Sequence, residues 1–228
     1  METNWIEIGG LVIRAPVTAG TNLFLAVQCA LYFRSLRAGP GARSRLWGGF
    51  FSMMAIATLA GALKHGFEHQ LSETGFLLVL WVSNVASGIA VYHAQRATSV
   101  THAPEHLKRR FDRLFQMQFF LFLAGNVALG PQILLVIVNM AVGLLPVIGV
   151  EAIALRRGYP GSGWVVGGLS LSILTAAVFL AGLSVGPWLN HMDIAHLLMG
   201  VSFWLIVRAC RPSVGAPREY GVAGPAGL

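Results

Sequence analysis

Charged residues are scarce in this chain of 228 residues: they make up 11% of it, whereas hydrophobic residues make up 55%. A water-soluble domain carries roughly 25% charged residues, so the scarcity of charge excludes a soluble globular fold. No hydrophilic stretch is long enough to form a second domain. We therefore expect one unit that is embedded in a membrane.

Cysteine is also rare, with two residues in the whole chain. Cys29 and Cys210 lie in or beside apolar segments and form no CxxC pair. This excludes a disulfide framework and favours two small apolar residues packed inside helices. Residues 1–16 lack the basic start and apolar core of a signal peptide, and we expect a short amphipathic lead-in at the membrane surface.

Long apolar stretches fill the rest of the chain, and seven of them can cross a membrane, which takes about 20 mostly apolar residues. They cover residues 17–34, 46–66, 76–95, 112–129, 132–154, 164–185 and 190–208. Gly130 and Pro131 form a turn signal between the fourth and the fifth stretch. We predict an all-α, polytopic membrane protein, a bundle of seven transmembrane helices over residues 1–211, followed by a flexible cytoplasmic tail over residues 212–228.

The basic residues set the expected orientation. All of the 16 lysines and arginines except Arg14 and Lys64 follow the first, third, fifth or seventh apolar stretch. The positive-inside rule puts that side in the cytoplasm, so the N-terminus is predicted outside and the C-terminus inside. The net charge of +7 then reflects topology, and no nucleic acid is expected as a partner. We expect a multi-pass protein of a bacterial cytoplasmic (inner) membrane, in contact with membrane lipids, and the oligomeric state stays open.

Four of the seven histidines gather at the predicted outer face. His65 and His69 lie at the end of the second stretch, which runs outward, and His191 and His196 lie at the start of the seventh, which runs inward. His65 and His69 share a face if the helix continues that far. His191 and His196 are about 140° apart on an ideal helix. His196 is deep enough in the membrane to need a partner.

Two carboxylates accompany these histidines as candidate catalytic groups. Asp193 follows Asn190 at the spacing of a capping box, and it is equally a candidate for a metal site or for orienting a metal-bound imidazole. Glu68 either forms a surface ion pair with Lys64 or serves as a general base for a water between the helices.

The four histidines, His65, His69, His191 and His196, are candidate metal ligands. Zinc is favoured, because catalytic zinc takes three protein ligands and a water. His65, His196 and one of His69 or His191 would complete that set, and the bound water would have its pKa lowered to about 7. Two alternatives remain open: haem b held between a histidine of each helix in an electron carrier, and a receptor-like or assembly protein with a structural metal.

Seven helices, a histidine late in the second and paired histidines early in the seventh resemble the CREST superfamily, which includes the alkaline ceramidases, the progestin and adiponectin receptors and the Per1-like proteins. The resemblance implies an intramembrane zinc held by one histidine of the second helix and two of the seventh. It also implies hydrolysis of a lipid amide or ester, with a lipid-like substrate.

The chain departs from that family's pattern at three places. Gly61 occupies the position of a serine four residues before the second-helix histidine. The third helix offers Ser83, Asn84 and Ser87 but no aspartate. The seventh-helix histidines are five residues apart, whereas the family spaces them by four. Asp193 and Glu68 are the carboxylates available to replace the missing aspartate.

The remaining polar and aromatic residues have simpler interpretations. His93, His102 and His106 lie among basic residues on the predicted cytoplasmic side, where we expect them to be solvated beside anionic head groups. Trp47 and Trp164 lie near cytoplasmic helix ends and fit the interfacial aromatic belt. The asparagines inside the apolar stretches are expected to form hydrogen bonds between helices. They are Asn22, Asn84, Asn126 and Asn139.

Overall fold

The computed structural model describes residues 4–39, 41–186 and 188–210, and this part of the chain forms seven helices and one small hairpin. The helices are α1 (Pro16–Leu36), α2 (Ala42–Phe67), α3 (Glu73–His102), α4 (Glu105–Leu129), α5 (Ile133–Arg156), α6 (Ser162–Leu180) and α7 (His191–Cys210). The predicted all-α class is confirmed. The predicted tail lies outside the described residues.

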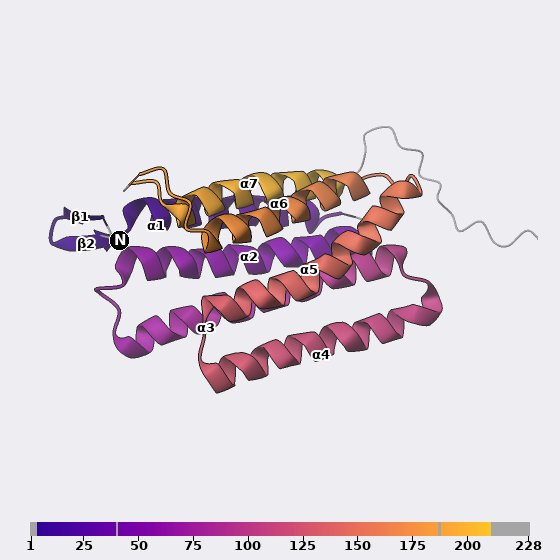
Figure 1. Ribbon diagram of the computed structural model, residues 1–228, viewed down its shortest axis with the longest axis horizontal. Coiled ribbons are helices and arrows are strands. Elements are labelled where there is room, and N and C mark those ends of the chain that lie inside the picture. The colour runs from indigo at the N-terminus through magenta and orange to yellow at the C-terminus, as the bar shows by residue number, and fades with distance from the viewer. Residues whose placement is uncertain (1–3, 40, 187, 211–228) are drawn as a thin grey trace, which may run out of the picture.

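The expected N-terminal lead-in is an antiparallel hairpin of β1 (Trp5–Ile8) and β2 (Leu11–Arg14). Gly9 and Gly10 turn the chain with φ of 58° and 81°, a conformation that glycine adopts without steric cost. The hairpin is tied to the end of α2, because Gln70 Nε2 donates to the Val12 carbonyl at 2.7 Å. It therefore sits at the same end of the bundle as the start of α1 (Figure 1).

Six helices form a closed ring. In order around the ring, α1 packs on α2, α2 on α3, α3 on α5, α5 on α6, α6 on α7, and α7 on α1. Helix α4 lies outside the ring against α3 and α5, along one edge of the molecule in Figure 1. The same six ring helices are long and apolar enough to cross a membrane.

Polar contacts between helices show which way each one runs. Asn84 of α3 donates to the Gln132 carbonyl just before α5 at 3.4 Å, and Gln95, three turns later, donates to Gly143 at 3.3 Å. Helices α3 and α5 therefore run in the same direction. Helix α4 returns between them, because Asn84 meets Asn126 at 2.7 Å and Gln95 meets Gln118 at 2.7 Å.

Two helix boundaries differ from the prediction for a physical reason. Helix α3 continues to His102 and α4 begins at Glu105, so the predicted loop between residues 95 and 112 is almost entirely helical. Charged side chains do not end a helix, whereas Pro104 forces Ala103 before it into an extended conformation. At the other end, α6 stops at Leu180, shortly before Gly182 with φ of 64°.

Aromatic side chains fill the half of the ring where α2 begins. Trp47, Phe50 and Phe51 of α2 are fully or almost fully buried, and both phenylalanines pack edge-on against Phe203 of α7 at 5.7 and 5.8 Å. The prediction that Trp47 belongs to an interfacial belt is wrong, because its ring packs edge-on against Phe50 inside the bundle. This half of the molecule is solid, and space remains in the half where α2 ends and α7 begins.

Candidate functional site

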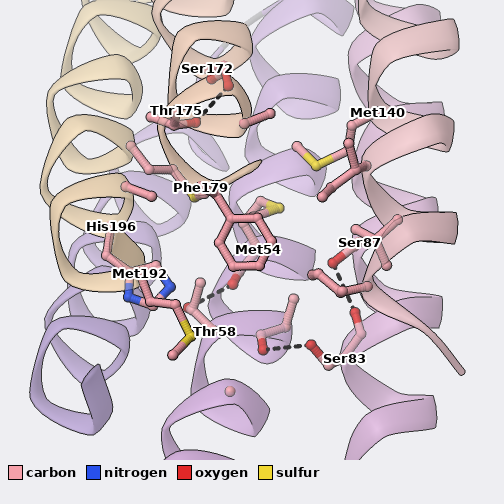
Figure 2. Close-up of a pocket in the computed structure, with 18 of the residues that line it drawn as sticks. Met54, Thr58, Ser83, Ser87, Met140, Ser172, Thr175, Phe179, Met192 and His196 are labelled. Carbon is pink, nitrogen blue, oxygen red and sulfur yellow. Dashed lines mark hydrogen bonds between the residues drawn. The ribbon is translucent and has the colours of Figure 1, made fainter. Parts of the chain in front are cut away.

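A cavity of about 300 Å³ occupies the centre of the ring, and its lining includes residues of all six ring helices and none of α4. Most of its wall is apolar. Lys64 and His65 of α2, His196 of α7 and Asn22 of α1 bring polar groups to the cavity. Figure 2 shows His196 and Met192 on one side of it and Ser83 and Ser87 on another.

The imidazole of His196 is held in place by α1. Its Nδ1 lies 3.0 Å from Thr21 Oγ1 and 3.4 Å from Asn22 Nδ2. The Thr21 hydroxyl donates its own proton to the Thr18 carbonyl at 3.1 Å. With that proton used, the Thr21 hydroxyl can accept a hydrogen bond from Nδ1–H of His196, and in this tautomer Nε2 keeps its lone pair. A histidine that is fixed through one nitrogen presents the other in a defined direction.

His65 reaches the same cavity from α2, as the sequence predicted for this pair of helices. Lys64, the preceding residue, also lines the cavity and adds a cation to its polar end. Two residues 131 positions apart in sequence thus meet at one place because α2 and α7 run in opposite directions.

Gly61 makes room for Asn22. A Cβ atom at position 61 would lie 2.6 Å from Asn22 Oδ1, which is closer than a Cβ atom approaches a neighbouring atom in real proteins. The amide of Asn22 therefore takes the space that a side chain at position 61 would need. A polar group is thus present beside Gly61, and α1 supplies it.

The start of α7 is a capping box, which is one of the two roles predicted for Asp193. Asn190 Oδ1 accepts from the Met192 amide at 2.8 Å, and Asp193 Oδ2 accepts from the Asn190 amide at 2.9 Å. The other oxygen of Asp193 accepts from the Thr18 hydroxyl at 2.7 Å. Asp193 is fully buried and does not line the cavity. It fixes the start of α7 relative to α1.

The remaining predicted site residues lie away from the cavity. Helix α2 ends at Phe67, so His69 lies in the following turn, where it is exposed. His191 packs against the Phe179 ring at 5.3 Å and does not line the cavity. Glu68 pairs with Arg14 of the hairpin at 3.1 Å, so its ion-pair partner is not the predicted Lys64.

The side chains near the cavity can be compared with the ligands that a zinc ion requires. Within residues 4–39, 41–186 and 188–210, no group of three or more histidine, cysteine, aspartate or glutamate side chains is arranged to hold a metal ion. His65 and His196 share the cavity, and catalytic zinc takes three protein ligands. The ligands of the described chain do not complete a zinc site, and zinc remains a prediction from sequence.

Residues 17–213 match a family of unknown function, DUF6962. The chain belongs to the DUF6962 family. No curated protein and no solved structure matches this DUF6962 member. The resemblance to the CREST superfamily stays a prediction from the sequence.

Sequence analysis of this DUF6962 chain missed Met192. It lies four residues before His196, a spacing that puts both side chains on one helix face, and it lines the cavity. That spacing was visible in the sequence, but only the histidines and carboxylates of this helix were candidate site residues.

A second buried polar cluster lies at the opposite end of the ring. Glu151 of α5 is fully buried and contacts Arg43 of α2 at 3.2 Å, and Thr98 and His102 of α3 at 3.1 and 3.3 Å. The prediction that His102 is solvated is wrong, because its side chain is 4% exposed. A carboxylate in an apolar stretch is itself a signal of such a cluster, and the cluster holds three helices together.

Proposed function

We propose that this protein hydrolyses an amide or ester bond of a lipid-like molecule that enters the central cavity. The observation that carries the proposal is the meeting of His65 and His196 in one cavity with mostly apolar walls. An apolar pocket with a few convergent polar groups is the usual form of a site for a small organic ligand. An acyl chain would lie along α5 and α6, with its polar linkage at the two histidines.

His196 is the proposed general base. With Nδ1–H bound to Thr21, the free Nε2 takes a proton from water while the water oxygen adds to the carbonyl carbon of the substrate. The C–N or C–O bond then breaks, and the imidazolium returns its proton to the departing nitrogen or oxygen. Atoms and protons balance, and the products are a carboxylic acid and an amine or alcohol.

Lys64 and His65 are proposed to stabilise the negative charge that develops on the carbonyl oxygen. Both line the cavity, and a positive charge or an N–H group in a water-poor site favours such an oxyanion. The carboxylate product would also be attracted to the Lys64 ammonium. The predicted catalytic roles of Asp193 and Glu68 are replaced by positioning roles, because neither lines the cavity.

The site is proposed to lie near the outer leaflet of a membrane that α4 also crosses. Support comes from the parallel directions of α3 and α5, since the chain must return across the bundle between them. The apolar half of α4 ends at a three-residue link to α5. With seven crossings and the basic residues inside, the N-terminus and the cavity would lie toward the outer face.

Turnover of fluorogenic lipid amides and esters by the purified protein in nanodiscs tests the proposal. Replacing His196 with alanine should lower the rate by about 10²- to 10⁴-fold, the usual contribution of a general base. His65→Ala should also lower it. His69→Ala is the matched control, because His69 is exposed beyond the end of α2, and it should keep the wild-type rate. Equal rates for the three variants would contradict the proposed site.

A further inference from the structure

Methionine sulfur is concentrated around the cavity. Of the seven methionines in the chain, four line it: Met54, Met140, Met192 and Met199. No aspartate or glutamate is among the lining residues within the described part of the chain. The sulfur and imidazole ligand groups at this cavity are therefore these thioethers and the side chains of His65 and His196, beside neutral amide and hydroxyl groups and the Lys64 ammonium. Thioethers are soft ligands that prefer Cu(I) to zinc.

Met192 and His196 form a pair on α7. They are four residues apart, a spacing that places two side chains on the same helix face, and both line the cavity, as Figure 2 shows. The capping box fixes the backbone at Met192, because its amide donates to Asn190 Oδ1 at 2.8 Å. The capping box thus holds the first turn of α7 in place, and Met192 and His196 extend from the start of this helix toward the cavity.

The hydrogen bonding of His196 is the kind found at metal sites. Imidazoles that bind a metal through one nitrogen usually donate from the other to a fixed acceptor. Nδ1 of His196 has such an acceptor in Thr21 at 3.0 Å, which leaves Nε2 for a ligand. His65 supplies a second imidazole from α2.

We propose that the cavity binds one Cu(I) ion through His65, Met192 and His196. Two neutral imidazoles and a thioether match a soft monovalent cation, whereas zinc commonly takes histidine, cysteine and carboxylate ligands. The Lys64 ammonium opposes a divalent cation more strongly than a monovalent one, because Coulomb repulsion scales with charge. This inference goes beyond the proposed hydrolysis.

Packing is the competing explanation for these methionines, because methionine fills irregular gaps in cores. The two explanations differ at Met192. If the residue only fills space, leucine should replace it without effect on metal binding, since exchanges between methionine and leucine are usually well tolerated. If it binds copper, leucine removes a ligand atom while keeping the volume.

The experiment is an anaerobic titration of the purified full chain with Cu(I) against a chromogenic chelator, with zinc in a parallel titration. Wild type should bind one Cu(I) per chain and should prefer it to zinc. Met192→Leu and His196→Ala should each weaken Cu(I) binding by at least about tenfold, and Thr21→Val by about 10- to 100-fold, as expected for a residue that orients a ligand. Met117→Leu is the matched control, because Met117 is exposed on α4, and it should leave binding unchanged.

Met192→His tests the metal preference directly. It creates the four-residue histidine spacing, so it should shift the site from Cu(I) toward zinc. The proposal is overturned if wild type binds no stoichiometric Cu(I), if Met192→Leu binds as tightly as wild type, or if Met192→His leaves the preference unchanged. Bound Cu(I) would also occupy Nε2 of His196 and so inhibit hydrolysis. Because the titration measures binding without turnover, failure of the hydrolase proposal leaves this test intact.

Discussion

At the scale of single residues, the contact between Gly61 and Asn22 determines how close α1 lies to the cavity. Any side chain at position 61 would meet the Asn22 amide, which also contacts His196. The absence of a side chain in α2 therefore allows α1 to support a group in α7. No pattern in the sequence marks this three-helix contact, because Gly61 lies in an apolar stretch with several other glycines.

We predict that Gly61→Ser lowers the free energy of unfolding by about 1–3 kcal/mol, the usual cost of overpacking. Asn22→Ala in the same chain should recover part of the loss, because it removes the clashing amide and makes the two changes non-additive. Thermal unfolding in detergent measures both. Gly167→Ser is the control, since a Cβ there meets nothing within 4 Å. Additive effects at Gly61 and Asn22 would show that the two side chains do not compete for space.

The histidines show what residue patterns can predict. The convergence of His65 and His196 follows from the directions of two apolar stretches, and the structure confirms that both line one cavity. His69 was expected to join His65 on one face of α2 only if that helix continued past Phe67. Helix α2 ends at Phe67. A capping box was recognisable from the spacing of Asn190 and Asp193. The hydrogen bond that the Thr18 hydroxyl donates to Asp193 was not recognisable, because it joins residues 175 positions apart.

At the scale of elements, α4 differs from the other helices. Its first half carries most of its charge, and Arg96 of α3 pairs with Asp112 there at 3.0 Å. Its second half is apolar and is held by the amides of Gln118 and Asn126. Exposed apolar side chains such as Phe120 and Leu121 cover its outer side. This distribution suits a helix that enters the membrane with its second half and faces lipid.

Labelling with a membrane-impermeant thiol reagent tests whether α4 crosses. Cysteine in place of Glu105, before the helix, and in place of Gln132, after it, should be reached from opposite sides of the membrane. Gln132→Cys should react in intact cells, and Glu105→Cys should react only after permeabilisation. The native cysteines, Cys29 and Cys210, are buried, so the parent chain supplies the background. Labelling of both positions from the same side would show that α4 does not cross.

At the scale of the whole molecule, the closed ring of six helices creates the cavity. Six of the seven predicted crossings were predictable from the length of their apolar stretches, and within the described residues the corresponding helices are long and apolar enough to cross a membrane. The order of the helices around the ring was not predictable. A helix that is apolar on all sides carries no stripe that marks its inner face. The aromatic cluster at one end, and the cavity at the other, depend on that order.

The proposed function requires the substrate to bind inside the ring. Ala141 of α5 lines the cavity, and the next residue, Val142, is exposed on the outside of the same helix. Phenylalanine at position 141 fills part of the cavity, whereas phenylalanine at position 142 faces lipid. The two variants thus add similar side chains one residue apart.

The most direct measurement is the rate of lipid amide or ester hydrolysis by Ala141→Phe compared with Val142→Phe, each confirmed to be folded by its thermal unfolding. We expect Ala141→Phe to lose most of the activity of the wild type and Val142→Phe to keep it. Equal rates for the two variants would contradict the proposed function, because the substrate would then not need the cavity.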